Sequence, residues 1–405
     1  MRYFSANFVT AVVLALTPLA KAVVAPQDAD LDHRDSSPPM SIAISTRAAT
    51  SFVKTSGQRF TVDGSTFTVA GANAYWIGLT GLSTTNMETA FADIAKTGAT
   101  VVPRRRGFNE VTSASGDYYH LWSGSTSSVN TGSTGLGNFD NVIAAAKASG
   151  LRLIVTLTNN WSDFGGMDVY VNQIVGAGKP HDLFYTNTKV IAAYKDYIKT
   201  FVSRYVNEPT ILGWELANEP RCSGSTGATS GSCTTATITS WAKDVSTYIK
   251  SIDSNHLVGL GDEGFFNEPN GPNFPYQGGE GIDFDANLAI SSIDFGTYHC
   301  YPISWGQTSD PTAWGVQWIK DHAASQKARN KPVIMEEFGV PDNQSSTYKT
   351  WYTTVISSSL TGDLIWQAGS HLPSGDTSDD GFTIYPDDPV YALETSHNAA
   401  LKARG

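Results

Sequence analysis

Two glutamates at the ends of apolar runs are the residues of this sequence best suited to chemistry. Residues 211–220 read ILGWELANEP, in which an apolar run leads to Glu219. Residues 332–339 read PVIMEEFG, in which a similar run leads to Glu336 and Glu337. Such runs are typical of buried strands, so each would deliver a carboxylate to the rim of a sheet. Glycoside cleavage uses such a pair, one carboxyl group to protonate the leaving oxygen and one to attack or to activate water.

The two runs belong to a longer series of strand-like segments that alternate with helix-like ones between residues 51 and 402. The eight expected strands start at Phe67, Ala99, Leu151, Ile211, Leu257, Asp294, Pro332 and Asp363. Strands separated by helices pair in parallel through right-handed crossovers, so eight such units predict an α/β fold with a single (β/α)8 TIM barrel. A doubly wound open sheet is the alternative, but no glycine-rich phosphate fingerprint follows the first strand.

In such a barrel the C-terminal ends of the strands meet on one face, where active sites are built. The polar and aromatic residues at or just after the expected ends are Asn73, Asn159, Asn160, Trp161, Asn218, Glu219, Glu263, His299, Tyr301, Glu337 and Trp366. This mixture suits a sugar, because hydroxyls need fixed donors and acceptors while the apolar face of a pyranose packs on an indole. A sugar site of this kind needs no cofactor. No metal site is expected either, since the sequence has no CxxC pair and no HExxH motif.

The charge and the N-terminus narrow the range of partners. The net charge is −11, and binding to phosphate groups needs a basic face, so neither nucleic acid nor an anionic membrane is expected as a partner. Residues 1–22 carry Arg2, an apolar stretch and an A-x-A-like end, which is typical of a secretory signal peptide. A membrane anchor is the alternative, but the apolar stretch is shorter than the ~20 residues that a span requires. We therefore expect a secreted, extracellular protein.

The rest of the chain reads as one domain after a short irregular segment. Residues 23–50 show no periodicity, so we expect a disordered tail or pro-segment there. Residues 51–405 would form the catalytic barrel, which we expect to be a monomer, and no linker inside them marks a second domain.

Three cysteines permit one disulfide and a remainder. Cys222 and Cys233 flank a loop of Gly, Ser, Thr and Ala, so a local bridge between them fits an oxidising compartment. Cys300 lies in an apolar run and is expected to be buried and inert.

Six motifs along the chain carry a resemblance to a known family. In order they are NNWSDFGGMDVYV, WELANEPRC, GDEGF, DFGTYHCYP, VIMEEFGV and LIWQAG. Together they closely resemble the fungal endo-β-1,4-mannanases of glycoside hydrolase family 5, over nearly all of residues 51–402. The resemblance implies a retaining enzyme that hydrolyses internal β-1,4-mannosidic bonds of mannan, glucomannan and galactomannan by double displacement. It also implies that Glu219 is the acid/base and Glu337 the nucleophile.

The same resemblance implies substrate-binding roles for further residues. Asn218 would hold the sugar 2-hydroxyl, and His299 and Tyr301 would line the cleavage site. Trp366 would form the floor under the sugar at that point. The other implied residues are Trp161 in the cleft, Arg221 and Glu263 on the leaving-group side, and Arg104, which would support the nucleophile.

We expect opposite protonation states for the two catalytic glutamates. Glu219 needs a raised pKa to hold its proton, which the nearby carboxylate would supply, whereas Glu337 must stay ionised through hydrogen bonds such as one from Tyr301. The neighbouring Glu336 would point away from the barrel centre, since alternation along a strand sends successive side chains to opposite sides.

The second strand departs from the family pattern. The family has a single Arg and then a Trp before GFNE, whereas this chain reads VVPRRRGFNE. If the alignment is counted back from GFNE, Arg104 occupies the position of the family arginine. If it is counted forward from the two valines, Pro103 occupies that position. A proline inside a strand removes a hydrogen-bond donor, so we expect either a bulge or a damaged strand end.

Two alternative functions follow from the sequence. The arginine run suggests a catalytically weakened mannan-binding protein. A β-1,4-glucanase of the same family is the second alternative, because the catalytic pair does not read the orientation of the sugar 2-hydroxyl.

Two sequons match the pattern for N-glycosylation, at Asn160 and at Asn343. We expect the first to lie in the cleft and to stay unmodified, and the second to lie in a loop and to carry a glycan.

Overall fold

The computed structural model describes residues 50–104 and 109–405. The side chain of Arg104, the expected signal peptide at 1–22 and all but the last residue of the segment at 23–50 lie outside the described part. Within the described residues, no helix combines the length and the apolar character needed to cross a bilayer.

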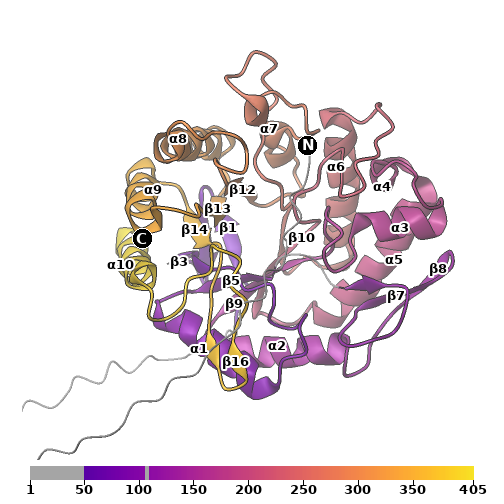
Figure 1. Cartoon of the computed structure of the whole chain (residues 1–405), viewed down its shortest axis with the longest axis horizontal. Coiled ribbons are helices and arrows are strands. Elements are labelled where there is room, and N and C mark those ends of the chain that lie inside the picture. Colours follow the sequence, from indigo (N-terminus) through magenta and orange to yellow (C-terminus); the bar gives the residue numbers. More distant parts are fainter. Residues whose placement is uncertain (1–49, 105–108) are drawn as a thin grey trace, which may run out of the picture. The chain divides into compact units, whose positions relative to one another are not determined.

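Eight parallel strands form one sheet that curls into a nearly closed barrel (Figure 1). They are β4 (Ala70–Ala72), β5 (Val101–Arg104), β9 (Arg152–Thr156), β10 (Ile211–Glu215), β11 (Leu257–Gly259), β12 (Gly296–Cys300), β13 (Val333–Phe338) and β14 (Gly362–Ile365). The order in the sheet is β11-β10-β9-β5-β4-β14-β13-β12. Backbone hydrogen bonds from Asp294 N to Val258 O and from His299 N to Glu263 O link its two ends. The predicted TIM barrel is confirmed.

Helices surround the strands, as Figure 1 shows. The long ones are α1 (Thr84–Lys96), α2 (Leu136–Ala148), α5 (Thr188–Tyr205), α6 (Thr235–Ile252), α8 (Pro311–Arg329), α9 (Gln344–Ser358) and α10 (Pro389–Arg404). Local sequence sets their starts: the Ser83 side chain accepts from Asn86 N before α1, and Asp310 accepts from Ala313 N before α8. Shorter helices lie in the connections, namely α3 (Met167–Ile174), α4 (Leu183–Thr186), α7 (Phe284–Leu288) and the 3-10 turn η1 (Phe274–Tyr276).

Smaller sheets flank the barrel. They comprise β1 (Lys54–Ser56), β2 (Arg59–Val62) and β3 (Ser65–Phe67), then β6 (Glu110–Val111), β7 (His120–Ser123) and β8 (Thr126–Val129), and the hairpin of β15 (His371–Leu372) and β16 (Gly375–Asp376). The first of these sheets closes the N-terminal end of the barrel, because Phe60 of β2 is fully buried and its ring lies 5.7 Å from that of Phe295.

An apolar layer fills the barrel next to Phe60. Each barrel strand contributes one residue at or directly before it, namely Val69, Val101, Ile154, Leu212, Leu257, Phe295, Ile334 and Leu364. Packed side chains of this kind make the interior a core and not a pore, so a ligand can approach only at the opposite, C-terminal end.

Strand β5 contains the proline that departs from the family pattern. Pro103 pairs with Ile154 of β9, and the pairing runs from Val101 to Arg104 without a shift of register. Its carbonyl oxygen accepts a hydrogen bond from Ala74 N at 3.3 Å. The strand therefore accommodates the proline without a bulge as far as Arg104. The rest of the arginine run, at 105–106, lies outside the described residues.

Three buried carboxyl groups make the stability of this fold depend on pH. Burial raises the pKa of Glu110 and of Glu394 from 4.5 to about 8, and that of Asp262 from 3.8 to about 7. A group whose pKa is raised in the folded state stabilises the fold fully below its unfolded pKa, and this contribution is lost as pH rises through its folded pKa. We therefore expect the free energy of unfolding to fall between about pH 4.5 and pH 8, by roughly 1–4 kcal/mol for each group.

Urea unfolding at pH 5 and at pH 8 measures this fall. Glu394→Gln keeps an acceptor for Asn398 Nδ2, which lies 3.5 Å from Oε1, but it cannot ionise, so the variant should lose less stability than the wild type over the same interval. Glu88→Gln on the exposed face of α1 is the matched control and should behave as the wild type. A wild-type free energy of unfolding that is equal at both pH values would contradict the prediction.

Candidate active site

A cavity of about 450 Å³ lies at the C-terminal ends of the barrel strands. Its lining residues are Asn159, Trp161, Asp163, Asn218, Glu219, Arg221, Glu263, Phe274, Tyr301, Ser304, Trp305, Glu337, Trp366, Asp380 and Phe382. Of the predicted site residues, His299, Arg104, Asn73 and Asn160 are missing from this lining. His299 is fully buried beneath it, and the side chain of Arg104 lies outside the described part of the chain. Asn73 and Asn160 are fully buried, so the expectation that Asn160 lies in the cleft is wrong.

Glu219 follows the end of β10, where the backbone takes a left-handed conformation. Its φ is 51°, which a residue with a side chain adopts only when its surroundings hold it there. Asn218 forms a parallel bridge with Asn159, and its Nδ2 donates to Asn159 Oδ1 at 3.0 Å. Glu219 N donates to Gly261 O at 2.9 Å. The segments that follow β9 and β11 therefore hold this turn from both sides.

Both carboxylate oxygens of Glu219 have hydrogen-bond partners. Oε1 lies 2.6 Å from His299 Nδ1, and Oε2 accepts from Trp161 Nε1 at 2.5 Å. Burial by itself raises the pKa of Glu219, but the hydrogen bond and charge of His299, the charge of Arg221 and the indole N–H together lower it to about 2. The expected raised pKa of Glu219 is therefore wrong for this arrangement.

Glu337 is the fifth residue of β13 and lines the cavity opposite Glu219. Tyr301 Oη donates to Glu337 Oε2 at 2.9 Å, as the sequence predicts. Burial, with the charges of Glu337 and Glu219, raises the pKa of Tyr301 well above its ordinary value, so the phenol stays protonated and remains a donor.

One histidine nitrogen limits the separation of the two carboxylates. His299 Nδ1 lies 2.6 Å from Glu219 Oε1 and 3.6 Å from Glu337 Oε2. These two oxygens can be no further apart than the sum of those distances. That limit lies below the ~6.5 Å at which the spacing of inverting glycosidases begins, and it accommodates the ~5–5.5 Å of retaining ones.

A bulge in β13 separates Glu336 from Glu337. The consecutive residues Tyr298 and His299 of β12 pair with Met335 and Glu337, which leaves Glu336 as the extra residue. Glu336 is fully buried and does not line the cavity. The expectation that only one of the two glutamates reaches the site is confirmed, although the bulge interrupts the simple alternation from which it was argued.

Arg221 and Glu263 form a two-pronged ion pair on one side of the cavity. Arg221 Nε and Nη2 donate to Glu263 at 2.5 and 2.7 Å, and Nη1 donates to Glu280 Oε2 at 3.2 Å. The guanidinium also lies 5.3 Å from the Trp161 ring and 5.0 Å from the Phe265 ring. Burial raises the pKa of Glu263 to about 7, with Arg221 opposing and Glu219 adding to this shift.

The residues Glu219, Glu263 and His299 also place three potential metal ligands within 4.8 Å of one another. Each of them is already engaged, since Glu219 and His299 bond to each other and Glu263 is paired with a guanidinium. The positive charge of Arg221 opposes a cation at this point. The arrangement fits a hydrogen-bonded site better than a metal site.

Trp366 lines the cavity, and its ring is fixed on two sides. It stacks on Tyr75 with 5.4 Å between centroids and 3° between planes. Its Nε1 donates to Asp380 Oδ2 at 2.8 Å, and the same oxygen accepts from Gln367 Nε2 at 2.9 Å. Neither Tyr75 nor Asp380 was expected from the sequence. The only sequence signal for them is a position in a loop after a strand, which many residues share.

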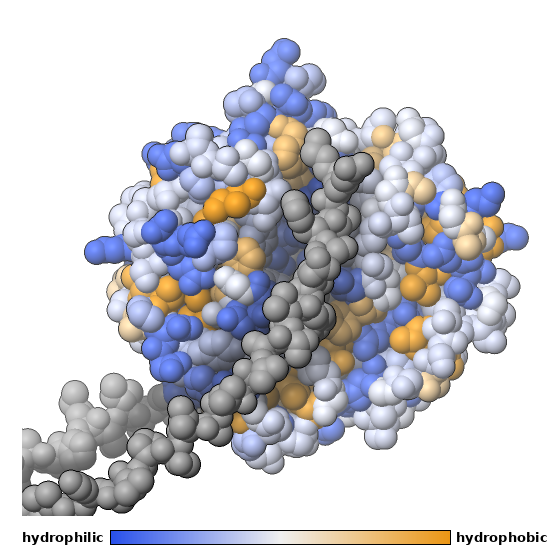
Figure 2. Space-filling model, viewed as in Figure 1, coloured by the Kyte–Doolittle hydropathy of each residue, from blue (hydrophilic) through white to orange (hydrophobic). Residues whose placement is uncertain are grey.

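Phe274 and Phe382 also line the cavity without having been predicted. Phe274 is the one large hydrophobic side chain among the described residues that is exposed, at 38%. Figure 2 shows hydrophobic residues on the viewed face as small separate patches among polar ones. An isolated exposed aromatic ring at a cavity is suited to stacking on a sugar face.

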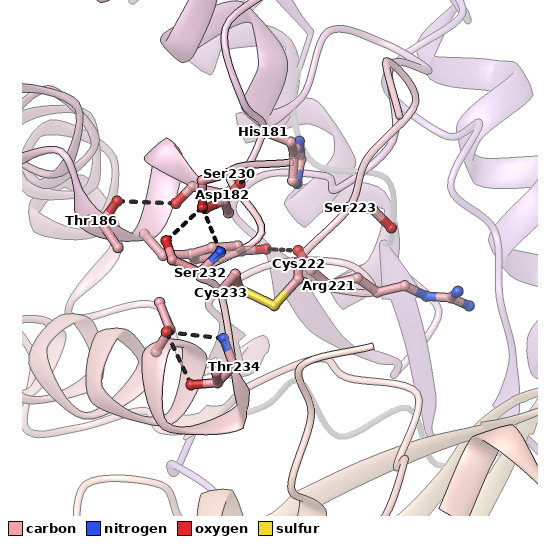
Figure 3. The surroundings of a disulfide bond; sticks show 12 residues. His181, Asp182, Thr186, Arg221, Cys222, Ser223, Ser230, Ser232, Cys233 and Thr234 are labelled. Carbon is pink, nitrogen blue, oxygen red and sulfur yellow. Dashed lines mark hydrogen bonds between the residues drawn. A yellow bond between two sulfur atoms is a disulfide. The ribbon is translucent and has the colours of Figure 1, made fainter. Parts of the chain in front are cut away.

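The predicted disulfide joins Cys222 and Cys233 with an S–S distance of 2.00 Å. Figure 3 shows it directly after Arg221, whose side chain extends away from the bridge. Cys222 N donates to Glu280 O at 2.9 Å, which ties the bridge to the residue that Arg221 also contacts. Cys300 is free and buried, as predicted.

A parallel barrel with two carboxylates and an aromatic floor at the C-terminal ends of its strands defines a glycoside hydrolase. Residues 63–372 match the family model described as cellulase (glycosyl hydrolase family 5). The chain therefore belongs to glycosyl hydrolase family 5, and the predicted family membership is confirmed.

Relatives in this family are similar along most of their length. The chain is 42% identical over 360 residues to the probable mannan endo-1,4-beta-mannosidase A of Aspergillus oryzae, covering 87% of this chain and 89% of that protein. It is 42% identical over 363 residues to the mannan endo-1,4-beta-mannosidase A of Aspergillus aculeatus, covering 88% and 92%. The solved structure of the endo-1,4-beta-mannanase from Rhizomucor miehei superposes with a TM-score of 0.81 at 42% identity, covering 87% of this chain and all of that one.

Proposed function

We propose that this chain is a secreted endo-β-1,4-mannanase that hydrolyses internal β-1,4-mannosidic bonds with retention of configuration. The observation that carries the proposal is the pair of carboxylates, Glu219 and Glu337, whose oxygens lie 2.6 and 3.6 Å from the same His299 nitrogen and therefore closer together than in inverting glycosidases. The names of the relatives from Aspergillus and Rhizomucor support mannan as the substrate.

The proposed reaction proceeds in two displacements. A carboxylate oxygen of Glu337 attacks the anomeric carbon while the bond to the leaving sugar breaks, and Glu219 gives its proton to the leaving oxygen. Water then attacks the same carbon, Glu219 accepts the proton of that water, and the bond to Glu337 breaks. The hydrogen bond from Tyr301 orients the attacking carboxylate of Glu337 for the first step.

The acidic proton has to reach Glu219 before the first step. His299 Nδ1 lies 2.6 Å from Glu219 Oε1 and is the nearest group that could supply it. An uncharged sugar that fills the cavity excludes water, and burial without water disfavours the separated charges of a carboxylate and an imidazolium. We therefore propose that substrate binding shifts the shared proton from His299 to Glu219.

The remaining cavity residues are proposed to bind the sugar chain. Trp366 would lie under the sugar at the cleavage point, Asn218 would hold its 2-hydroxyl, and Trp161 would contribute to the same cleft. Arg221 and Glu263 would contact the sugar on the leaving-group side. We propose mannan, glucomannan and galactomannan as substrates, and a monomer as the active form.

Release of reducing sugar from galactomannan by the purified protein tests the proposal. A soluble cellulose derivative, assayed in parallel, separates a mannanase from a β-1,4-glucanase of the same family. We expect turnover of galactomannan and little or none of the cellulose. Binding to mannan without turnover would instead support the weakened mannan-binding protein, and single-Arg replacements of residues 103–106 would then identify its cause.

If the protein is secreted, the two sequons are expected to differ in glycosylation. Asn343 is exposed directly before α9, whereas Asn160 is fully buried and its Nδ2 donates to Ser223 O at 3.1 Å. After expression through a eukaryotic secretory pathway, we expect a glycan on Asn343 and none on Asn160. A decrease in mass upon peptide-N-glycosidase treatment, abolished in Asn343→Gln, would show this, and glycopeptides containing Asn160 would contradict it.

A further inference from the structure

A buried chain of three polar side chains lies behind the cavity wall. Asp168 is in the first turn of α3, His181 lies between α3 and α4, and Asn160 follows β9. All three are buried, at 6% exposure or less. None lines the cavity, so none can touch a substrate there.

The hydrogen bonds fix the protons along this chain. Asn160 Nδ2 donates to Ser223 O at 3.1 Å and Oδ1 accepts from Arg221 N at 3.0 Å, which settles the orientation of the amide. His181 Nε2 lies 2.9 Å from the same Oδ1, and its Nδ1 lies 2.7 Å from Asp168 Oδ1. An amide oxygen can only accept, so Nε2 carries a proton. Nδ1 and Asp168 Oδ1 are close enough that one proton must lie between them in a hydrogen bond.

Asn160 holds the backbone on both sides of Glu219. Its own N donates to Asn218 O at 3.0 Å, while its side chain bonds Arg221 N and Ser223 O. The residue between these contacts, Glu219, has the left-handed φ of 51° that needs outside support. Rotation of the Asn160 amide would release this turn.

The loop that follows Arg221 covers the histidine ring. A Cβ on Gly224 would lie 2.3 Å from His181 Nδ1, so the backbone passes close over the imidazole. His181 N also donates to Ala228 O at 2.8 Å, inside the loop that the disulfide closes. Figure 3 shows His181 and Ser223 on the same side of that bridge. The imidazole is therefore fixed by contacts on both nitrogens and on one face.

We propose that Asp168, His181 and Asn160 form a positioning relay that holds Glu219 in the orientation needed to protonate the leaving oxygen. The relay rests on the proposed acid role of Glu219 and adds three residues that act through it. Asp168 orients the ring of His181, which in turn fixes Asn160 Oδ1. Asn160 then holds the turn that carries Glu219.

Two substrates whose leaving groups differ in acidity distinguish a loss of Glu219 positioning from a general loss of folding. Mannopentaose needs a proton on its leaving oxygen, whereas 2,4-dinitrophenyl β-mannobioside releases a phenolate that needs none. We expect Asp168→Ala and Asn160→Ala to lower kcat/KM for mannopentaose by roughly 10- to 100-fold. The value for the dinitrophenyl substrate should change by less than about 3-fold, because kcat/KM reports the first displacement. Asp168→Asn keeps an acceptor for Nδ1 and should recover part of the loss.

A second buried Asp–His pair provides the matched control. His256 Nδ1 lies 2.5 Å from Asp253 Oδ2 and its Nε2 lies 2.9 Å from Glu208 O, at the opposite end of the barrel from the cavity. Asp253→Ala should lower the melting temperature and leave the ratio of the two kcat/KM values as in the wild type. If Asp168→Ala does not fold, the two kcat/KM values are compared in Asp168→Asn and Gly224→Ala instead. The Gly224→Ala variant displaces the His181 ring.

The outcomes separate this proposal from the proposed function. Equal loss on both substrates in the relay variants, or a ratio no different from that of Asp253→Ala, would overturn the relay. Glu219→Ala serves as the reference, with a large loss on mannopentaose and a small one on the dinitrophenyl substrate. If Glu219→Ala shows that pattern and the relay variants do not, only the relay fails. If the wild type does not hydrolyse mannopentaose, the proposed function fails with it.

Discussion

Glu337→Gly is expected to lose roughly 10³-fold or more of the activity on galactomannan, and sodium azide is expected to restore cleavage of an activated substrate with formation of an α-linked mannosyl azide. The loss follows because the residue that forms the covalent intermediate dominates such losses. Azide fits the space that the side chain vacates and attacks as the carboxylate would. A single displacement inverts the configuration, so the β-linked substrate yields an α-linked product.

The product is identified by NMR of the anomeric proton after incubation of the variant with 2,4-dinitrophenyl β-mannobioside and azide. The matched control is Glu336→Gly, which removes the buried neighbour that does not line the cavity and should give no azide product. A β-linked azide from Glu337→Gly, or full activity without azide, would show that Glu337 is not the nucleophile. Circular dichroism of both variants monitors the fold.

Glu219→Ala is expected to produce the opposite stereochemical result. The first displacement on Glu337 still occurs with a dinitrophenyl leaving group, but the glycosyl-enzyme then lacks the base that activates water. Azide needs no base, so it should accelerate turnover and yield a β-linked mannosyl azide after two inversions. On galactomannan, whose leaving oxygen needs a proton, we expect a loss of about 10²–10⁴-fold.

Burst kinetics with the dinitrophenyl substrate check this second prediction. A rapid release of one equivalent of dinitrophenol, followed by slow turnover that azide accelerates, is the expected pattern for Glu219→Ala. The conservative Glu219→Gln retains an acceptor for Trp161 Nε1 and should behave in the same way, since it also carries no transferable proton. An α-linked azide, or no response to azide, would remove Glu219 from the acid/base role.

The positions of the two glutamates were predictable because each stands at the end of an apolar run, where topology alone brings strand ends together. The direction of the pKa shift of Glu219 was not predictable from the sequence. It depends on a 2.6 Å contact with His299, which lies 80 positions further along the chain. The sequence places both residues at one face but does not specify which atoms meet, and a hydrogen bond at that distance outweighs the repulsion between two carboxylates.

Other parts of the site were beyond sequence reasoning for different physical reasons. The bulge at Glu336 changes the register by one residue, and no composition signal accompanies it. Asp380 accepts the hydrogen bond that orients Trp366. It is one of five aspartates between residues 376 and 388, and the sequence does not show which of them makes this contact. The Asp168–His181–Asn160 chain joins a helix, a loop and a strand end, so its members show no common spacing in the sequence.

The pairing of β4 with β14 has a consequence for synthesis of the chain. The first strand of the barrel hydrogen-bonds to the last one, and Asn73 Nδ2 donates to Ile365 O at 3.2 Å across the same junction. Until residue 365 leaves the ribosome, β4 has an open edge with no partner on that side, and such edges invite pairing with other chains. Nearly 300 residues must be made before this contact can form. Slower elongation late in the message would therefore prolong the aggregation-prone interval, whereas a chaperone bound to the nascent barrel would cover the open edge during it.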